Sequence, residues 1–326
     1  TLDLKAGGGT AERTFQMSQF LAKQGVDCKV LTLKIDLDMD RIDALKPAEV
    51  IALPCIWNRF YLPWASLSRI KRLIEATDII HIMGHWGILN ALVYILARRA
   101  KKPYVVCPAG ALPLFGRSLF LKHFYNLVVG RSLIRNASAW IAVTTCELPH
   151  FERYGIKPSK VTVIPNGINP KDFLVPINNN FFKQSGLDMA PFILFMGRLN
   201  PIKGPDMLLQ AFISAKSKIP KHHLVFAGPD DGMLSQLIQD VKQAKLSDYV
   251  HFVGYLSGAD KSAAYHNAQL LVVPSRQEAM SIVAIEAGVC GTLALLTDQC
   301  GFSEVVQIDS RLEVAATVDG ISTSLI

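Results

Sequence analysis

The feature that most constrains the fold is an alternation of short apolar runs with longer helical patterns. Runs rich in Val, Ile, Leu and Phe, most of them followed by Gly, Pro or Asn, are typical of buried strands. Strands that alternate with helices form parallel sheets. The sequence therefore predicts an α/β fold. The runs are residues 27–33, 79–86, 102–108, 139–145, 160–167, 192–196, 224–230, 250–256, 270–273 and 293–296.

The length of the chain predicts two domains. Its 326 residues are 50% apolar, enough for two sizeable cores. Residues 168–190 contain Pro170, Pro176 and Gly186, which favours a linker with a hinge. We therefore expect an N-terminal domain of residues 1–175 and a C-terminal domain of residues 176–326, both Rossmann-like.

Residues 271–291 place two carboxylates, Glu278 and Glu286, eight positions apart at the join of a strand and a helix. Ser281 is the expected N-cap of that helix. Such a join lies at the carboxyl edge of a parallel sheet, where α/β proteins bind ligands and helix N-termini favour phosphate. We expect the two carboxylates to face the hydroxyl groups of a phosphorylated ligand.

Two cations follow the run at 192–196. Arg198 and Lys203 lie between this expected strand and a helix starting at Pro205. A forked guanidinium and a compact ammonium aimed at one anion suit recognition of a diphosphate.

A glycine-rich turn follows residues 1–4, which resemble the end of a strand. Gly8 and Gly9 lie in this turn, and a helical period continues from it to Gly25. Glycines let backbone N–H groups approach a diphosphate. The turn is not a dinucleotide fingerprint, because Glu12 stands where the third glycine belongs.

These motifs together resemble the retaining family-4 glycosyltransferases, which have the two-domain GT-B fold with parallel sheets facing a central cleft. The segment from Glu278 to Glu286, the Arg198/Lys203 pair and the Gly8–Gly9 turn carry the resemblance. It implies that Glu278 contacts the transferred sugar and Glu286 the ribose. It also makes Arg198, Lys203 and Glu278 the expected catalytic residues.

The resemblance further implies nucleotide contacts in two loops. Backbone groups in the loop after residues 250–254 would hold the nucleobase, and the start of the following Glu-containing helix would line the donor. With Gly8, Gly9 and Glu286, the expected donor-binding residues are Gly254, Tyr255, Leu256, Ser281, Ile282 and Val283.

The activity implied is metal-independent, retaining transfer of a hexose from a nucleotide-diphosphate sugar, with no further cofactor. The acceptor would be a saccharide or a lipid-linked molecule, in surface polysaccharide or lipopolysaccharide assembly. Departures from the family include Ala109 in place of a His, Ser281 in place of a Gly and Met280 in place of a common Phe. A GT-B protein that binds without turnover, or an epimerase, therefore remains an alternative.

The first of these departures raises the question of a substitute histidine. His81 and His85, at the end of the run at 79–86, are the candidates.

The family chain normally continues to a terminal helix that returns to the first domain, so the resemblance implies that this sequence is incomplete at Ile326.

Composition and residue spacing argue against several other classes of protein. Asp36, Asp38 and Asp40 lack the spacing of a calcium loop, so no metal site is expected. The six cysteines lack C-x-x-C pairing, which favours reduced thiols in the cytoplasm. Residues 87–97 are too short to span a bilayer, and no signal peptide or nucleic-acid-binding module is present.

Charge is unevenly distributed. Residues 1–175 hold 23 Lys and Arg against 13 Asp and Glu, or +10, whereas residues 176–326 hold 11 against 14, or −3. A basic first half suits an anionic membrane face or a lipid-phosphate acceptor, and a generally basic soluble protein without such a partner explains the charge equally well. Residues 117–135 could lie on such a membrane, although an ordinary amphipathic helix packed on the sheet is the first interpretation.

Overall fold

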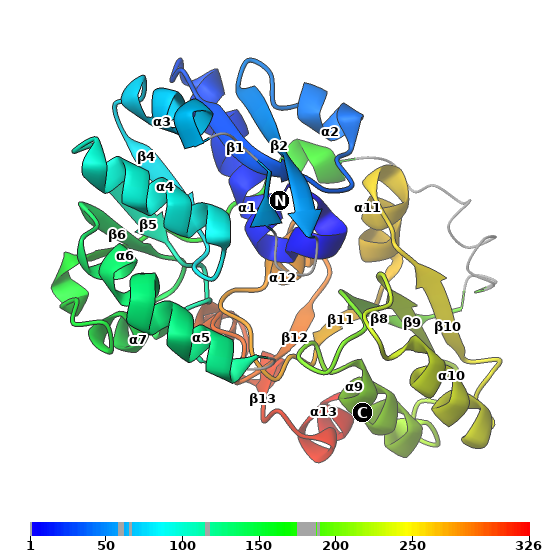
Figure 1. Ribbon diagram of the computed structural model, residues 1–326. Coiled ribbons are helices and arrows are strands. Elements are labelled where there is room, and N and C mark those ends of the chain that lie inside the picture. The colour runs from blue at the N-terminus through cyan, green and yellow to red at the C-terminus, as the bar shows by residue number, and fades with distance from the viewer. Residues whose placement is uncertain (1, 58–61, 65–66, 115–117, 175–186, 188–189) are drawn as a thin grey trace. The chain divides into compact units, whose positions relative to one another are not determined.

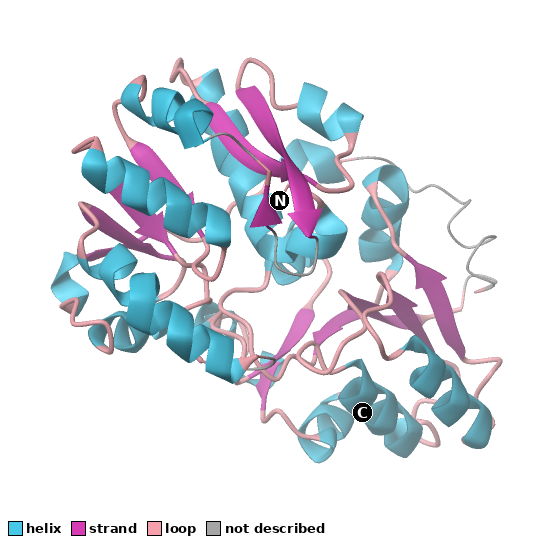
Figure 2. Cartoon of the chain, in the orientation of Figure 1, coloured by secondary structure: helices cyan, strands magenta, loops and turns pink. Residues whose placement is uncertain are grey.

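The computed structural model describes residues 2–57, 62–64, 67–114, 118–174, 187 and 190–326. The chain forms two compact units, Thr1–Asn166 (unit 1) and Gly167–Ile326 (unit 2), shown in Figure 1. Both combine helices with mainly parallel strands (Figure 2), which confirms the predicted α/β class. The expected domain boundary after residue 175 lies outside the described residues.

Unit 1 contains two sheets, with strand orders β1-β2-β3 and β4-β5-β6-β7. All neighbours are parallel except β2 and β3. The strands are β1 Lys29–Lys34, β2 Glu49–Trp57, β3 Leu62–Pro63, β4 Ile80–Met83, β5 Tyr104–Cys107, β6 Ala139–Ala142 and β7 Val161–Val163. The helical elements are α1 Leu4–Lys23, α2 Met39–Asp43, α3 Leu67–Glu75, α4 Ile88–Arg99, α5 Leu119–Tyr125, the π-helical η2 Asn126–Gly130, α6 Arg131–Arg135, η3 Thr145–Glu147, α7 Leu148–Glu152 and η4 Pro158–Lys160.

The start of unit 1 differs from the sequence-based expectation. Residues 2–4 do not form the end of a strand, because α1 already begins at Leu4, and Leu2 is instead buried in a cluster with Phe15. Residue 1 lies outside the described residues. The prediction also missed β2, whose apolar run is interrupted by Pro54, a residue that normally argues against a strand.

Unit 2 contains one six-stranded sheet of parallel neighbours with the order β10-β9-β8-β11-β12-β13. Its strands are β8 Phe192–Met196, β9 His223–Ala227, β10 Val250–Gly254, β11 Leu270–Val273, β12 Ala294–Thr297 and β13 Glu313–Val314. Its helical elements are η5 Pro170–Phe173, α9 Pro205–Ala215, α10 Leu234–Gln243, α11 Gly258–Asn267, α12 Ile282–Val289, η6 Ser303–Gln307, η7 Ser310–Leu312 and α13 Val318–Ser324.

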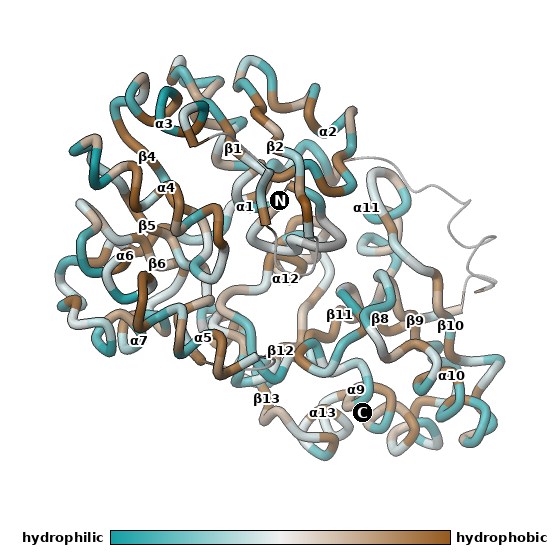
Figure 3. The backbone as a smooth tube through the Cα atoms, in the orientation of Figure 1, coloured by the Kyte–Doolittle hydropathy of each residue, from teal (hydrophilic) through white to brown (hydrophobic). Residues whose placement is uncertain are grey.

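Alternate residues of the central strands enter two different cores. Leu194 of β8 belongs to one buried cluster, and its neighbours Ile193 and Phe195 belong to another. The sheet is thus covered on both faces, as expected for parallel strands, and the strands of both units are mainly brown in Figure 3. Strand order reverses between β8 and β11, so the loops after these strands diverge at a topological switch point.

The segment after Asn166 packs into unit 2. The Phe173 ring lies 6.2 Å from that of Tyr265, and the Phe173 carbonyl accepts hydrogen bonds from Ser262 and His266. This packing accounts for a division between Asn166 and Gly167, before the expected residue 175. Among the described residues, no helix combines the length and apolar character needed to cross a membrane.

Candidate functional site

The loops after β8 and β11 form one packed unit at the switch point. Gly204 has a φ of 68°, and a Cβ there would lie 2.1 Å from the carbonyl oxygen of Pro274, so only glycine fits. The Arg276 backbone N–H donates to the Ile202 carbonyl at 2.8 Å. These contacts bring residues about 70 positions apart in the sequence against each other.

Arg276 fastens the same loops through its side chain. Its guanidinium donates to both carboxylate oxygens of Asp206, at 2.9 and 2.7 Å, and to the Pro201 carbonyl at 2.7 Å. A bidentate Arg–carboxylate pair fixes orientation as well as distance. The role of Arg276 could not be predicted from the sequence, because a lone Arg in a loop carries no local signal of its partner.

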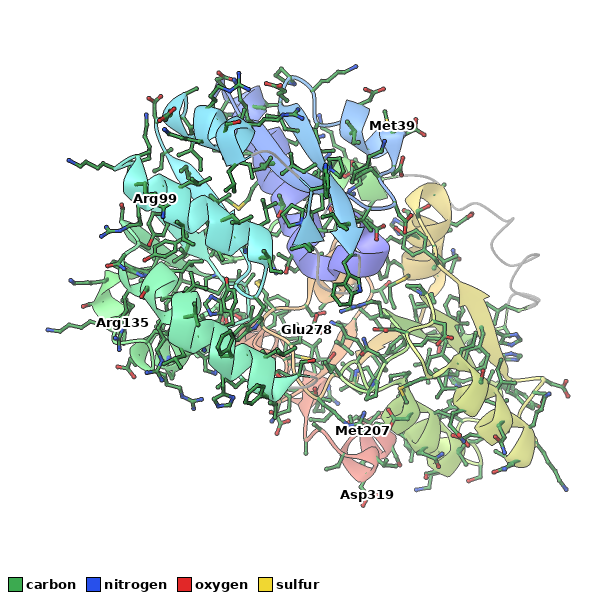
Figure 4. All side chains as sticks on the ribbon, viewed as in Figure 1. Met39, Arg99, Arg135, Met207, Glu278 and Asp319 are labelled. Carbon is green, nitrogen blue, oxygen red and sulfur yellow. The ribbon has the colours of Figure 1, made fainter. Side chains whose placement is uncertain are left out.

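Two of the predicted catalytic residues are in direct contact. Lys203 Nζ lies 2.7 Å from Glu278 Oε1, and Ser275 Oγ donates to Glu278 Oε2 at 3.0 Å. Both charged side chains are mostly buried. Glu278 lies in the loop between β11 and α12 (Figure 4). The pair places a cation and a carboxylate at the switch point, and the ammonium retains donors for a further anion.

Arg198, the third predicted catalytic residue, lies in the same loop as Lys203 but has another partner. Its guanidinium is 3.6 Å from Asp231 Oδ2, which also accepts a hydrogen bond from Asn200 Nδ2 at 2.8 Å. The neighbouring Asp230 stabilises the turn itself, because its carboxylate accepts three backbone N–H bonds, which lower its pKa.

Helix α12 begins as predicted. Ser281 is fully buried, and its hydroxyl accepts a 3.4 Å hydrogen bond from the Ala284 N–H. Its φ of −76° needs none of glycine's conformational freedom. Ile282 is buried and Val283 packs against the core, so these side chains support the helix.

Glu286, on the second turn of α12, is the most buried of the predicted site carboxylates. Lys261 Nζ donates to its Oε1 at 2.6 Å, and the Tyr265 hydroxyl donates to its Oε2 at 2.6 Å. Burial, with the neighbouring carboxylate, raises the pKa of Tyr265 well above its ordinary value, so the hydroxyl remains a donor. Lys261 and Tyr265 could not be predicted from the sequence as partners of Glu286, since pairing between α11 and α12 is a tertiary contact.

The predicted nucleobase loop follows β10. Gly254 has a φ of 72°, and its carbonyl accepts a 2.7 Å hydrogen bond from the Gly228 N–H. The Leu256 side chain packs on the unit 2 core, while Tyr255 is exposed. The loop lies at the carboxyl edge of the sheet, the same edge that carries the loops after β8 and β11.

Gly8 and Gly9 lie in unit 1, within a helix that Gly8 interrupts with a φ of 53° and a ψ of −139°. One turn later, the buried Arg13 donates to the Ile164 and Pro165 carbonyls and to Asn166 Oδ1, at 2.9 to 3.0 Å. Arg13 therefore ties the glycine segment to the end of β7.

The position of the family histidine, Ala109, has a φ of 49°. The next residue, Gly110, donates its N–H to Glu147 Oε1 at 2.5 Å, and Val143 donates to Oε2 at 2.6 Å. Burial raises the pKa of Glu147, against the opposing effect of these hydrogen bonds. This carboxylate, which sequence analysis missed, holds the backbone where the histidine would stand.

The two suggested substitute histidines differ in exposure. His85 is buried, and its Nε2 lies 2.9 Å from Asn126 Oδ1. Burial lowers the pKa of His85 to about 4, against a smaller opposing effect of Asn126. His81 on β4 is exposed. His85 therefore belongs to the packing of unit 1.

Of the aspartates in residues 36–40, Asp38 stabilises the backbone. Asp38 caps α2 by accepting hydrogen bonds from the Asp40 and Arg41 N–H groups. Among the described residues, no group of three or more His, Cys, Asp or Glu side chains could hold a metal ion.

The fold defines a class of α/β protein built from two Rossmann-like units, and comparison with known proteins gives the family. Residues 8–167 match the family described as glycosyl transferase 4-like domain, and residues 177–315 match glycosyl transferases group 1. An uncharacterized glycosyltransferase of Methanocaldococcus jannaschii is 34% identical over 92% of this chain and 79% of its own. The chain belongs to the group 1, or family-4, glycosyltransferases.

Two further relatives carry more specific names. Mannosylfructose-phosphate synthase of Agrobacterium fabrum is 30% identical over 92% of this chain and 73% of its own. D-inositol 3-phosphate glycosyltransferase of Jonesia denitrificans is 29% identical over 55% of this chain, and the match spans 45% of that protein. The match thus covers less than half of this last relative.

Solved structures share the fold. Anabaena HepE in complex with UDP and glucose has a TM-score of 0.72 at 18% identity, covering 97% of this chain and 91% of its own. WaaG, described as involved in lipopolysaccharide biosynthesis, has a TM-score of 0.67 at 18% identity, covering 98% and 86%. These likenesses confirm the predicted two-domain, Rossmann-like GT-B fold.

Proposed function

We propose that this chain is a retaining, metal-independent glycosyltransferase that moves a hexose from a nucleotide-diphosphate sugar to an acceptor hydroxyl. The observation that carries the proposal is the Lys203–Glu278 ion pair at the switch point of unit 2. Family membership supports the reaction class, and the neighbour bound to UDP and glucose supports the type of donor.

The proposed chemistry follows from where charge develops. The bond between the anomeric carbon and the phosphate oxygen breaks, and its electron pair goes to the leaving diphosphate. Lys203 and Arg198 stabilise that negative charge, which is larger in the transition state than in the bound donor. The acceptor oxygen bonds to the anomeric carbon on the same face and passes its proton to the leaving phosphate.

Each carboxylate has a separate role in the proposal. Glu278 accepts hydrogen bonds from hydroxyls of the transferred sugar, and its contact with Lys203 aligns the ammonium with the adjacent diphosphate. Glu286 accepts from the ribose, while Lys261 and Tyr265 hold its carboxylate in place.

We further propose an acceptor that carries phosphate, either free or on a lipid-linked saccharide. The excess of basic residues in 1–175 supports an anionic acceptor. The names of the relatives that act on inositol 3-phosphate or make mannosylfructose-phosphate support the same class. Surface polysaccharide or lipopolysaccharide assembly is one setting for such an acceptor.

A donor screen tests the proposal. UDP, GDP and ADP sugars are added to the purified chain, with melting temperature and then release of nucleoside diphosphate as the readouts, because a bound ligand raises apparent stability. Transfer with retained anomeric configuration, unchanged by EDTA, is the expected result. Binding without turnover would support the non-catalytic alternative, and an epimerised donor the epimerase.

Lys203→Met tests the role proposed for Lys203. Lys242→Met, on the exposed face of α10, is its matched control. Removing the cation beside the leaving group should lower kcat by about 10² to 10³. Equal kcat values for the two variants would contradict the role proposed for Lys203.

A further inference from the structure

The outer face of the α5–η2 segment in unit 1 is apolar and exposed. Six of its large side chains project into solvent, and two of them, Phe120 and Leu127, are 81% and 82% exposed. We name this set the α5 patch: Leu119, Phe120, Leu121, Phe124, Leu127 and Val128.

The opposite face of the same segment is also apolar, but it is buried. Val129, Leu133 and Ile134 enter the unit 1 core, and Asn126 reaches His85 and the Tyr154 hydroxyl. The first interpretation of residues 117–135, an amphipathic helix packed on the sheet, is therefore confirmed for the inner face, whereas the outer face carries exposed apolar side chains where polar ones are usual. Folding of unit 1 already uses the inner face, so core packing does not explain the outer one.

Basic residues lie next to the apolar ones along the same exposed face. Arg131 and Arg135 follow Leu127 and Val128 at helical spacing, and both are exposed. Figure 4 shows the Arg135 side chain at the margin of unit 1. The exposed face thus passes from apolar residues to cations within about three turns.

Acidic residues are absent from a long stretch of sequence around the patch. Between Asp78 and Glu147 there is no Asp or Glu, and eight Lys and Arg: residues 98, 99, 101, 102, 117, 122, 131 and 135. Most of the +10 balance of residues 1–175 comes from here, and a local excess of this kind attracts an anionic surface.

We propose that the α5 patch docks unit 1 onto an anionic phospholipid surface. Its aromatic and aliphatic side chains enter the interfacial region, and Arg131 and Arg135 contact lipid phosphates. Apolar burial and electrostatic attraction add, and two such signals together give stable yet reversible binding. A protein partner would gain from the apolar side chains but would not account for an acid-free stretch of this length. This proposal does not depend on the nucleotide-sugar activity.

Vesicle co-sedimentation of the full chain tests the proposal. Binding is expected to vesicles of phosphatidylcholine containing phosphatidylglycerol, and it should weaken as salt is added. The double variant Phe120→Ser, Leu127→Ser should reduce binding by at least about tenfold. Phe20→Ser on α1 is the matched control, because Phe20 is also an exposed aromatic residue of a unit 1 helix, and it should bind like the unmodified chain.

A second pair of variants tests the electrostatic part. Arg131→Gln should weaken binding about fivefold, whereas Arg69→Gln, an exposed arginine on α3, should have little effect. Unchanged tryptophan fluorescence would verify that each variant is folded.

Three outcomes would overturn the proposal. The first is equal vesicle binding by the double variant and the Phe20→Ser control. The second is equally strong binding to vesicles of phosphatidylcholine alone. The third is absence of vesicle binding together with self-association that the double variant abolishes, which would assign the patch to a second copy of the chain.

Discussion

The carboxyl edges of the two units use charge in different ways. In unit 2, charged side chains pair with one another across loops, as in Lys203–Glu278 and Arg276–Asp206, and remain partly exposed. In unit 1, Arg13 and Glu147 are buried and bind mainly backbone groups. The first arrangement leaves donors and acceptors for a ligand, and the second holds the backbone itself.

The comparison separates two kinds of charged residue that look alike in a sequence. A buried charge that binds backbone groups has most of its hydrogen-bonding capacity used within the protein, and removing it leaves those groups unsatisfied. A partly exposed ion pair contributes less to stability and can exchange partners. Substitutions in unit 1 should therefore affect folding, whereas substitutions at the switch point of unit 2 should affect binding.

The largest expected loss of stability follows from Glu147→Ala. It leaves the Gly110 and Val143 N–H groups without their acceptor, at a cost of about 3 kcal/mol. All four tryptophans lie in unit 1, so denaturant unfolding followed by their fluorescence reports this unit. Nucleotide affinity, measured by titration calorimetry, should not change. A large loss of affinity would contradict the distinction between charges that stabilise the fold in unit 1 and charges that bind a ligand in unit 2.

Acid should destabilise unit 1 through His85. The folded chain keeps this imidazole neutral, with a pKa of about 4, so between pH 6.5 and 4 the unfolded chain binds more protons. The free energy of unfolding should fall by about 3 kcal/mol as the pH is lowered through this window. His85→Gln should make the pH dependence measured by tryptophan fluorescence less steep without abolishing it, because the pKa of His81 is also lowered to about 4. An equally steep profile in that variant would assign the effect to other groups.

Lys261→Met tests a charged pair of unit 2. Removing the ammonium leaves the buried Glu286 carboxylate with the Tyr265 hydroxyl as its donor, so unit 2 should lose about 2 kcal/mol of stability. Nucleotide affinity should also fall about tenfold, because the carboxylate is no longer held in place. Calorimetric titration measures the affinity, with Lys242→Met as the control. Loss of stability with unchanged affinity would make this pair structural, like those of unit 1.

The smallest effect is expected for Ser281→Gly, which restores the residue typical of the family. Glycine replaces a serine N-cap at a cost of a few tenths of a kcal/mol. Affinity for the donor should stay the same if the serine only caps α12. A tenfold gain in affinity would instead indicate that the hydroxymethyl group crowds the donor.

Strands buried on both faces were the easiest elements to predict. β8 and β11 were placed with their observed bounds, because uninterrupted apolar residues with flanking turns leave few alternatives. β2 was missed because Pro54 breaks its pattern, and the first residues were misassigned because α1 continues through a glycine triplet that normally ends a helix. In both cases tertiary packing outweighed local propensity.

The candidate site likewise has features that the sequence predicts and features that it does not. The sequence alone determined which residue types follow which strands: Arg198 and Lys203 after one, Glu278 before a capped helix with Glu286 inside it. Those are local facts, and local periodicity and capping encode them. Only the tertiary structure decided the partners, since Lys203 meets Glu278 and Glu286 meets Lys261 through strand order and helix packing. It also decided that the outer face of α5 stays exposed, because burial depends on what the rest of the chain leaves uncovered.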